Sequence, residues 1–152
     1  MKVNLLMTEE RVALGASHRI VITQEDLTQT TVNTAQVIKL LDIPAGGLVR
    51  NVYTKLQARF ANTADTDLNT TALTIGDAGT ANLFLASQEL NVNGTEVRFK
   101  AGTGTQKAYD AAAVLNATFG SMALKSLADL NAGEVHIFVE LIDVGNYDGA
   151  VI

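Results

Sequence analysis

Three short groups of residues have types and spacing that could support chemistry. Residues 101–107 read AGTGTQK, glycines followed by a lysine, as in loops that bind phosphate. A phosphate loop needs two glycines five positions apart, followed directly by Lys and Ser or Thr and then by a helix. The spacing here differs and no strong helical pattern follows. We therefore interpret residues 101–110 as a flexible loop.

The second group is acidic and could bind calcium. Asp65, Asp67 and Asn69 place oxygen ligands two residues apart, as calcium loops do. A helix–loop–helix calcium loop also requires glycine at its sixth position and glutamate at its twelfth, whereas Thr70 and Asp77 stand there. We interpret this segment as a solvated loop without a metal.

The third group lies on the last predicted strand, where Glu134, His136 and Glu140 share one face. A histidine beside carboxylates can act as a general acid or base, or contribute to a metal site with further histidines. The only other histidine is His18, there is no cysteine, and no serine occupies a G-x-S-x-G motif. We therefore interpret His136 as a surface or interface residue. We expect no catalytic residues, no cofactor and no metal site.

Composition points to a protein whose surface carries its function. The 152 residues suffice for one domain, or one domain with an arm. Charged residues are 18%, below the usual ~25%, which suggests a surface partly covered by other molecules. The net charge of −5 argues against nucleic-acid binding, and no apolar run is long enough to span a membrane. The start, MKVNLLMTEE, does not resemble a secretory signal.

Short alternating strands separated by turn residues dominate the chain. This pattern predicts an all-β fold, a jelly-roll-like β-sandwich with at most two short helices. A capping box from Thr23 to Asp26 predicts one helical turn, and residues 121–131 fit either a helical turn or a loop. Residues 80–90 fit either a helical turn or an irregular loop. The pattern predicts six or seven strands, and the candidate segments are residues 18–23, 30–41, 48–60, 71–75, 96–100, 111–119 and 134–144.

The two longest strands carry further detail. In residues 48–60 the alternation predicts that Leu48, Val52, Leu56, Ala58 and Phe60 face inward, and that the strand bends or bulges at Arg50. In residues 134–144, Phe138 and Ile142 make the second face half-apolar. That pattern predicts a cover over this face, either from another molecule or from the N-terminal segment of the same chain.

The chain divides into an arm of residues 1–17, a sandwich of residues 18–144 and a tail of residues 145–152. Glu9, Glu10 and Arg11 could sit in a helical turn that Gly15 ends. The arm is expected either to become ordered by contact with another molecule or to be a frayed terminus. The expected contact residues are the apolar members of both ends: Leu5, Leu6, Val12, Leu14, Tyr147, Val151 and Ile152.

Turn and core motifs over about two thirds of the chain resemble those of tailed-bacteriophage head-decoration (cement) proteins and related small virion proteins. The resemblance lies in their order and not in catalytic residues. The motifs are VIKLLDIPAG at 37–46, VRNVYTKL at 49–56, LTIGD at 73–77, FLA at 84–86 and LNAGEVHIFV at 130–139.

This resemblance implies a structural protein on the outer surface of an icosahedral capsid, made in the host cytoplasm. The implied partners are the major capsid protein and further copies of the chain, as a homotrimer or a dimer. A head-fibre or tail component is the alternative. A carbohydrate-binding sandwich is less well supported, because the chain has no Trp and only three Tyr to form sugar platforms.

Overall fold

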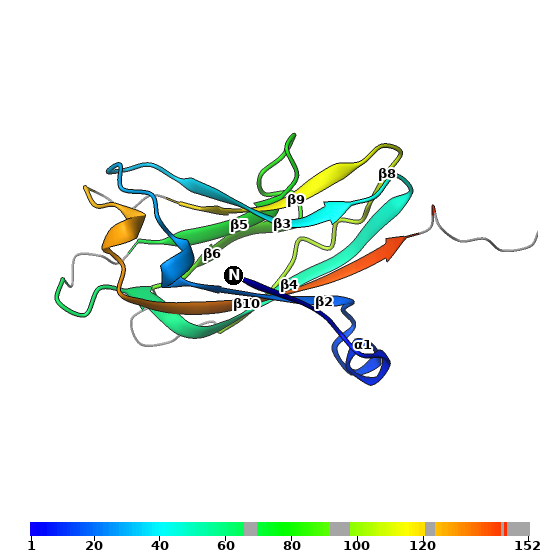
Figure 1. Cartoon of the computed structure of the whole chain (residues 1–152), viewed down its shortest axis with the longest axis horizontal. Helices are drawn as coiled ribbons and strands as arrows, with labels where there is room; N and C mark the ends of the chain where they lie inside the picture. The colour runs from blue at the N-terminus through cyan, green and yellow to red at the C-terminus, as the bar shows by residue number, and fades with distance from the viewer. Residues whose placement is uncertain (66–69, 92–97, 121–123, 144, 146–152) are drawn as a thin grey trace, which may run out of the picture.

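Two antiparallel β-sheets face each other across a shared core in the computed structural model of the chain (Figure 1). The structure describes residues 1–65, 70–91, 98–120, 124–143 and 145. The prediction of an all-β sandwich is confirmed. Within the described residues there are ten strands, more than the six or seven that the sequence predicted.

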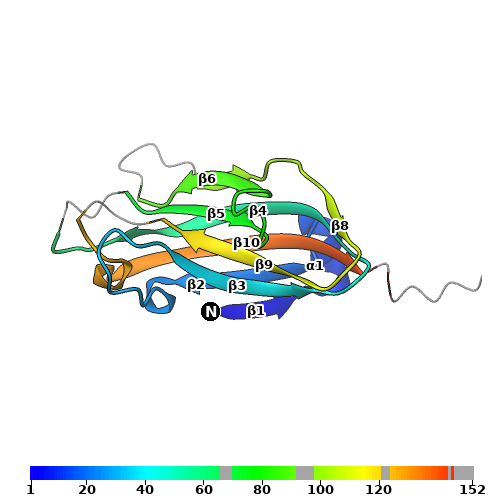
Figure 2. The ribbon, with the colours of Figure 1, turned by 90° about the horizontal axis from the view of Figure 1, so that it is seen from above.

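We name the sheets A and B. Seen from above, β1 of sheet A and β3 of sheet B lie along the same side of the sandwich (Figure 2). Sheet A has the order β1 (Lys2–Leu5), β2 (His18–Thr23), β10 (Ala132–Asp143), β4 (Gly47–Ala61), β7 (Phe99–Ala101), and β8 (Lys107–Tyr109) also pairs with β4. Sheet B has the order β3 (Gln36–Ile43), β9 (Ala113–Phe119), β5 (Ala72–Gly76), β6 (Leu85–Glu89).

Alternate side chains of both sheets fill the core, as the period of a strand requires. On β9, Leu115, Ala117 and Phe119 share one parity, and all three are fully buried. The rings of Phe60 and Phe119 meet across the sheets with centroids 5.9 Å apart. The large, fully buried side chains are Phe60, Phe84, Phe119, Ile20, Ile22, Ile43, Leu56, Leu73, Ile75, Leu85 and Leu90.

The predicted bulge at Arg50 is confirmed. On β10, Glu140 pairs with Asn51 and Leu141 pairs with Val49, so Arg50 is the extra residue. The bulge reverses the alternation before it, which is why Val49 is buried and Leu48 is only half-buried. The expectation that Leu48 faces inward with Val52 was therefore wrong.

A second irregularity, at the other end of β4, contradicts the predicted burial of Ala58. Glu134 pairs with Ala58 and Val135 with Leu56, so Gln57 is skipped. Ala58 is therefore exposed, although its parity predicted burial. The bulges let one 15-residue strand follow the curvature of the core.

Helical structure is short, and its predicted signals hold. Helix α1 (Thr8–Leu14) ends at Gly15, whose φ of +59° is a left-handed conformation that glycine adopts without strain. The turn η1 (Gln24–Asp26) begins where Thr23 N–H donates to Asp26 Oδ2 at 2.9 Å, as the capping box predicted. Residues 121–131 hold only the turn η2 (Leu127–Asp129) among those described.

Four further expectations need correction. The strand predicted over residues 30–41 begins only at Gln36, whose side chain holds the preceding turn by accepting from Thr28 N and Gln29 N. Residues 80–90 contain strand β6 and not a helical turn. The alternation of residues 96–100 predicts that Phe99 faces inward together with Val97, but Phe99 is 66% exposed, and Val97 lies outside the described residues. The near-helical spacing within residues 121–131 groups Leu124 with Leu127 and Leu130, but Leu124 is 79% exposed whereas the other two are buried.

Candidate interaction surface on sheet A

The face of sheet A that points away from sheet B carries a row of side chains that runs across five strands. Lys2 pairs with Val21, Val21 with His136, His136 with Lys55, and Lys55 with Phe99. Directly paired residues place their side chains on the same face, so these five stand abreast. The neighbours of His136 along β10, Val135 and Ile137, are fully buried on the opposite, inner face.

The next row contains the aromatic pair that the N-terminal segment covers. Arg19 pairs with Phe138, and Phe138 pairs with Tyr53. Leu6 and Ala16 pack on Phe138 in a small apolar cluster separate from the main core. The predicted second apolar face of β10 is thus covered at Phe138 by the chain's own N-terminal segment.

Polar contacts anchor this segment at its other end. Ser17 Oγ donates to the carbonyl of Val139 at 3.1 Å and accepts from Leu141 N–H at 2.9 Å. The Tyr53 hydroxyl donates to the carbonyl of Leu14 at 2.5 Å, and burial raises the pKa of Tyr53. Residues 1–17 are therefore attached to sheet A through β1, Leu6, Ala16 and Ser17.

The expected contact residues of the arm divide into an anchor and exposed members. Leu6 is 3% exposed and anchors the arm on its own sheet. Leu5, Val12 and Leu14 are 64%, 82% and 39% exposed. Met7, which is not among the predicted contact residues, is 76% exposed. Tyr147, Val151 and Ile152 lie outside the described residues.

Exposed apolar side chains concentrate on this part of the molecule. Figure 1 shows α1 on the side of sheet A away from sheet B. Six of the ten large apolar side chains that are exposed on the described residues belong to residues 1–14, which favours an interaction there. These six are Met1, Val3, Leu5, Met7, Val12 and Leu14. A seventh, Phe99, lies on β7 at the opposite edge of sheet A.

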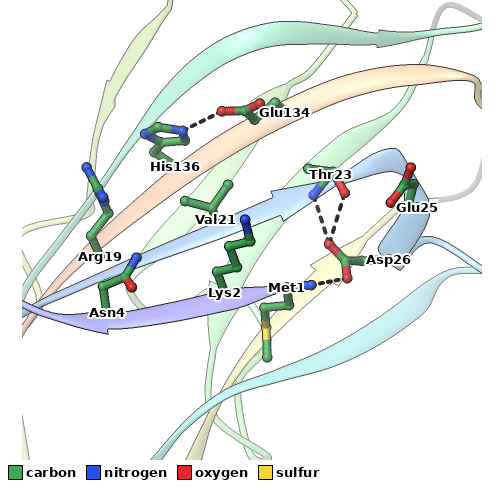
Figure 3. Close-up of a pocket in the computed structure, with 10 residues that line it drawn as sticks. All are labelled: Met1, Lys2, Asn4, Arg19, Val21, Thr23, Glu25, Asp26, Glu134 and His136. Atoms are coloured by element: carbon green, nitrogen blue, oxygen red, sulfur yellow. Dashed lines mark hydrogen bonds and ion pairs between the residues drawn. The ribbon is translucent and has the colours of Figure 1, made fainter.

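A shallow hollow of about 480 Å³ lies on the outer face beside β1 (Figure 3). Lys2, Arg19 and His136 line it from three adjacent strands. His136 Nε2 lies 2.7 Å from Glu134 Oε1, and the chain's amino group is paired with Asp26. The shared face of Glu134 and His136 was predicted correctly, and the pair occupies an open surface.

The two histidines do not converge. His18 has the same parity on β2 as the buried Ile20 and therefore faces the other side of the sheet from His136. Burial lowers the pKa of His18, and the nearby Arg11 lowers it further. Among the residues described, no three His, Asp or Glu side chains gather closely enough to hold a metal ion.

Sheet A is also the more basic of the two sheets. Its strands contain seven Lys or Arg and three acidic residues, whereas those of sheet B contain one and two. In a chain of net charge −5, this distribution leaves the acidic excess to the loops and ends. The sheet A residues are Lys2, Arg19, Arg50, Lys55, Arg59, Lys100 and Lys107 against Glu134, Glu140 and Asp143; those of sheet B are Lys39 against Asp42 and Glu89.

Lys107, the lysine of the phosphate-loop-like segment, forms an ion pair within the chain. Lys107 Nζ lies 2.5 Å from Asp77 Oδ2, and the Tyr109 hydroxyl donates to the same oxygen at 2.8 Å. Burial alone would raise the pKa of Asp77, but hydrogen bonds from Lys107, Tyr109, Thr80 N–H and Gly79 N–H outweigh it and lower the pKa to about 2. The group connects β8 of sheet A to the turn after β5 of sheet B.

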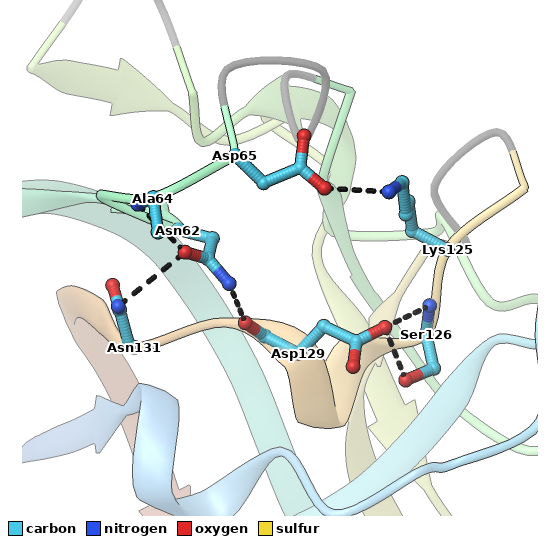
Figure 4. Close-up of polar contacts among 7 residues, drawn as sticks. All are labelled: Asn62, Ala64, Asp65, Lys125, Ser126, Asp129 and Asn131. Atoms are coloured by element: carbon cyan, nitrogen blue, oxygen red, sulfur yellow. Dashed lines mark hydrogen bonds and ion pairs between the residues drawn. The ribbon is translucent and has the colours of Figure 1, made fainter.

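The segment that resembles a calcium loop also forms an ion pair within the chain, at Asp65, which the structure describes. Figure 4 shows Asp65 paired with Lys125, with Oδ2 and Nζ 2.5 Å apart. Asn62 Nδ2 donates to the carbonyl of Asp129 at 2.7 Å, and Ser126 N–H donates to Asp129 Oδ2 at 3.0 Å. These contacts fasten neighbouring loops at one end of the sandwich. Asp67 and Asn69 lie outside the described residues.

No protein-family model matches the chain, and no curated protein matches it. Solved structures do. A chain of the cyanophage Pam1 capsid asymmetric unit has a TM-score of 0.56 at 20% identity, over 80% of this chain and 79% of that one. A chain of the acidic stable capsid of Helicobacter pylori bacteriophage KHP30 has a TM-score of 0.51 at 16% identity, over 82% and 88%.

At these identities the comparisons establish a shared fold. The chain is a two-sheet antiparallel β-sandwich of a kind that also occurs in the two phage capsid structures. No helix in the described part of the chain is long and apolar enough to cross a membrane.

Proposed function

We propose that the protein is a structural component of a tailed-phage virion that binds the outer surface of the capsid and stabilises it. The carrying observation is that the two solved structures compared above are of phage capsids, and that each match covers about four fifths of this chain. The order of turn and core motifs in the sequence supports the same role. The role is not enzymatic.

The exposed apolar residues support binding through the arm. Leu5, Met7 and Val12 stand out into solvent on a segment that Leu6 fastens to the sheet. A preordered arm loses less entropy on binding than a free one. Many symmetric copies on a shell would add avidity to a weak individual contact.

The partners in this proposal are the major capsid protein and further copies of the chain, in a homotrimer or a homodimer. Residues 1–17 and 145–152 are the proposed contact segments. A sugar-binding role is less well supported, since Tyr53 is stacked under the arm and Tyr109 is buried against Asp77. Neither ring is available as a sugar platform.

Electron microscopy of particles from the phage that encodes the chain tests the role. Particles lacking the protein are mixed with purified protein and imaged, beside the same particles alone. Added density on the shell at local three-fold or two-fold positions is the expected result. Density on fibres or tail would favour the alternative component, and unchanged particles would contradict both.

A further inference from the structure

Several basic side chains of the described residues form ion pairs with a carboxylate of their own chain, but three on the outer face of sheet A do not. Arg50 pairs with Glu140, Lys107 with Asp77, Lys125 with Asp65 and Lys39 with Asp42. Within the described part of the chain, Lys2, Arg19 and Lys55 form no ion pair. These three therefore have no carboxylate in direct contact, although Glu134 and Glu140 also lie on this face.

We propose that this face docks on an acidic protein surface. The identity of that surface rests on the proposed virion role. We define the basic face as Lys2, Arg19, Lys55 and Phe99. On the proposed function the acidic surface belongs to the capsid shell. Charge complementarity sets the orientation, and the adjacent apolar arm adds contact area.

The geometry fits a single protein contact. Lys2 and Lys55 stand in one row, three strand spacings apart, which is about 14 Å at the usual interstrand distance. A patch of this width lies within the footprint of a standard protein interface. The rigid sheet holds the charges at fixed separations, so a partner carboxylate can meet each of them without reordering the backbone.

One pair of side chains on this face is arranged for an external partner. Lys55 Nζ lies 5.8 Å from the ring centroid of Phe99, which is 66% exposed. A cation held over an exposed ring presents, at the same point, a positive charge for a partner's carboxylate and an apolar surface.

A protein partner is favoured over nucleic acid. The net charge of −5 opposes a phosphate backbone and an acidic protein surface alike, so the choice between them rests on the other features of this face. Glu134 also lies on this face beside His136 and interrupts the positive charge. The exposed Met7 and Val12 next to the face suit an apolar protein contact.

The direct test measures binding to immobilised poly-L-glutamate and to a double-stranded DNA fragment. The test variant is Lys2→Gln with Lys55→Gln. The matched control is Lys39→Gln with Thr30→Asp, which lowers net charge equally at exposed positions away from the face. We expect the test variant to bind poly-L-glutamate about fivefold more weakly than wild type, and the control to bind as wild type. Equal binding by the test variant, or DNA binding as tight as poly-L-glutamate binding, would overturn the inference.

The second test uses particles and keeps the two proposals separate. Carbodiimide joins lysine amines to carboxylates in contact, so wild-type protein on particles should cross-link to a shell subunit through Lys2 or Lys55. If wild type binds particles but the Gln variant binds equally and Lys2 and Lys55 give no cross-links, the basic face is wrong and the virion role stands. If wild type binds poly-L-glutamate in the expected way but no particle, the virion role fails and the basic face stands.

Discussion

The ring of Tyr53 stacks on the ring of Phe138, with centroids 4.8 Å apart and an angle of 8° between the planes. The pair joins neighbouring strands β4 and β10 on the outer face of sheet A. Leu6 and Ala16 close over it. The stack therefore forms the base on which the N-terminal arm is ordered, and the exposed apolar residues of that arm depend on it.

Phe138→Ala should release the arm and destabilise the protein. Phe138 is 8% exposed, so truncation removes a buried ring and leaves Leu6 without its packing surface. We expect a loss of about 3 kcal/mol in the free energy of unfolding. Urea titration measures the loss. Relative to wild type, amide hydrogen exchange should become faster in β1 and α1, and should change less in β9. Val37→Ala, at a 61% exposed position on β3, should stay within about 0.5 kcal/mol of wild type.

Asp77→Asn should weaken the connection between the two sheets. The amide carries no charge for Lys107 and is a poorer acceptor for the Tyr109 hydroxyl, both of which now bond to Asp77 Oδ2. We expect a loss of about 2 kcal/mol, the range for a hydrogen bond to a charged group. Chemical unfolding at neutral pH gives the value. Asp110→Asn, at an exposed position directly after Tyr109, is the control and should change little.

The same carboxyl should make stability depend on pH in the acid range. The pKa of Asp77 is about 2 in the folded protein, below the ordinary value of 3.8. A lowered folded-state pKa stabilises the fold above the ordinary pKa, and that stability is lost as pH falls from about 4 towards 2. The melting temperature of wild type should therefore fall over this range more steeply than that of Asp77→Asn. Parallel curves for the two proteins would contradict this role of Asp77.

Gly102→Ala tests a close approach of backbone between the sheets. A Cβ on Gly102 would lie 2.2 Å from the carbonyl oxygen of Val52 and 2.6 Å from that of Phe84. Both atoms belong to backbone, so the loop must shift. We expect a loss of more than about 2 kcal/mol by thermal or urea unfolding. Gly104→Ala, where φ is +79° and no atom lies near, carries only the backbone strain of about 1 kcal/mol.

Regular alternation made the central strands predictable, while the assembled face was not. β2, β9 and β10 have β-branched or apolar residues at every second position, and even the bulge at Arg50 left a signal in the parity of β4. β6 reads LASQE and β8 has three residues, so neither carries a strand pattern. The row from Lys2 to Phe99 depends on β10 entering between β2 and β4. That pairing joins opposite ends of the chain and leaves no local signal.

Deleting residues 1–15 should abolish particle binding and leave the sandwich folded. The cluster of Leu6, Ala16 and Phe138 is separate from the main core, so removing the arm exposes Phe138 but opens no cavity between the sheets. A far-ultraviolet spectrum close to that of wild type, with a lower melting temperature, is expected. Co-sedimentation with particles measures binding.

A finer variant separates contact from folding within the arm. Met7→Ser with Val12→Ser removes two apolar side chains that are 76% and 82% exposed, while Leu6 and the stack beneath it stay in place. Its stability should match wild type within about 0.5 kcal/mol, because neither side chain is buried. Its binding to particles should nevertheless fall, since an apolar interface loses those contacts. Wild-type occupancy of particles by both this variant and the truncated chain would show that the arm is not the contact segment. Loss of particle binding with the truncation alone would place the contact on β1, which includes Leu5, instead of α1.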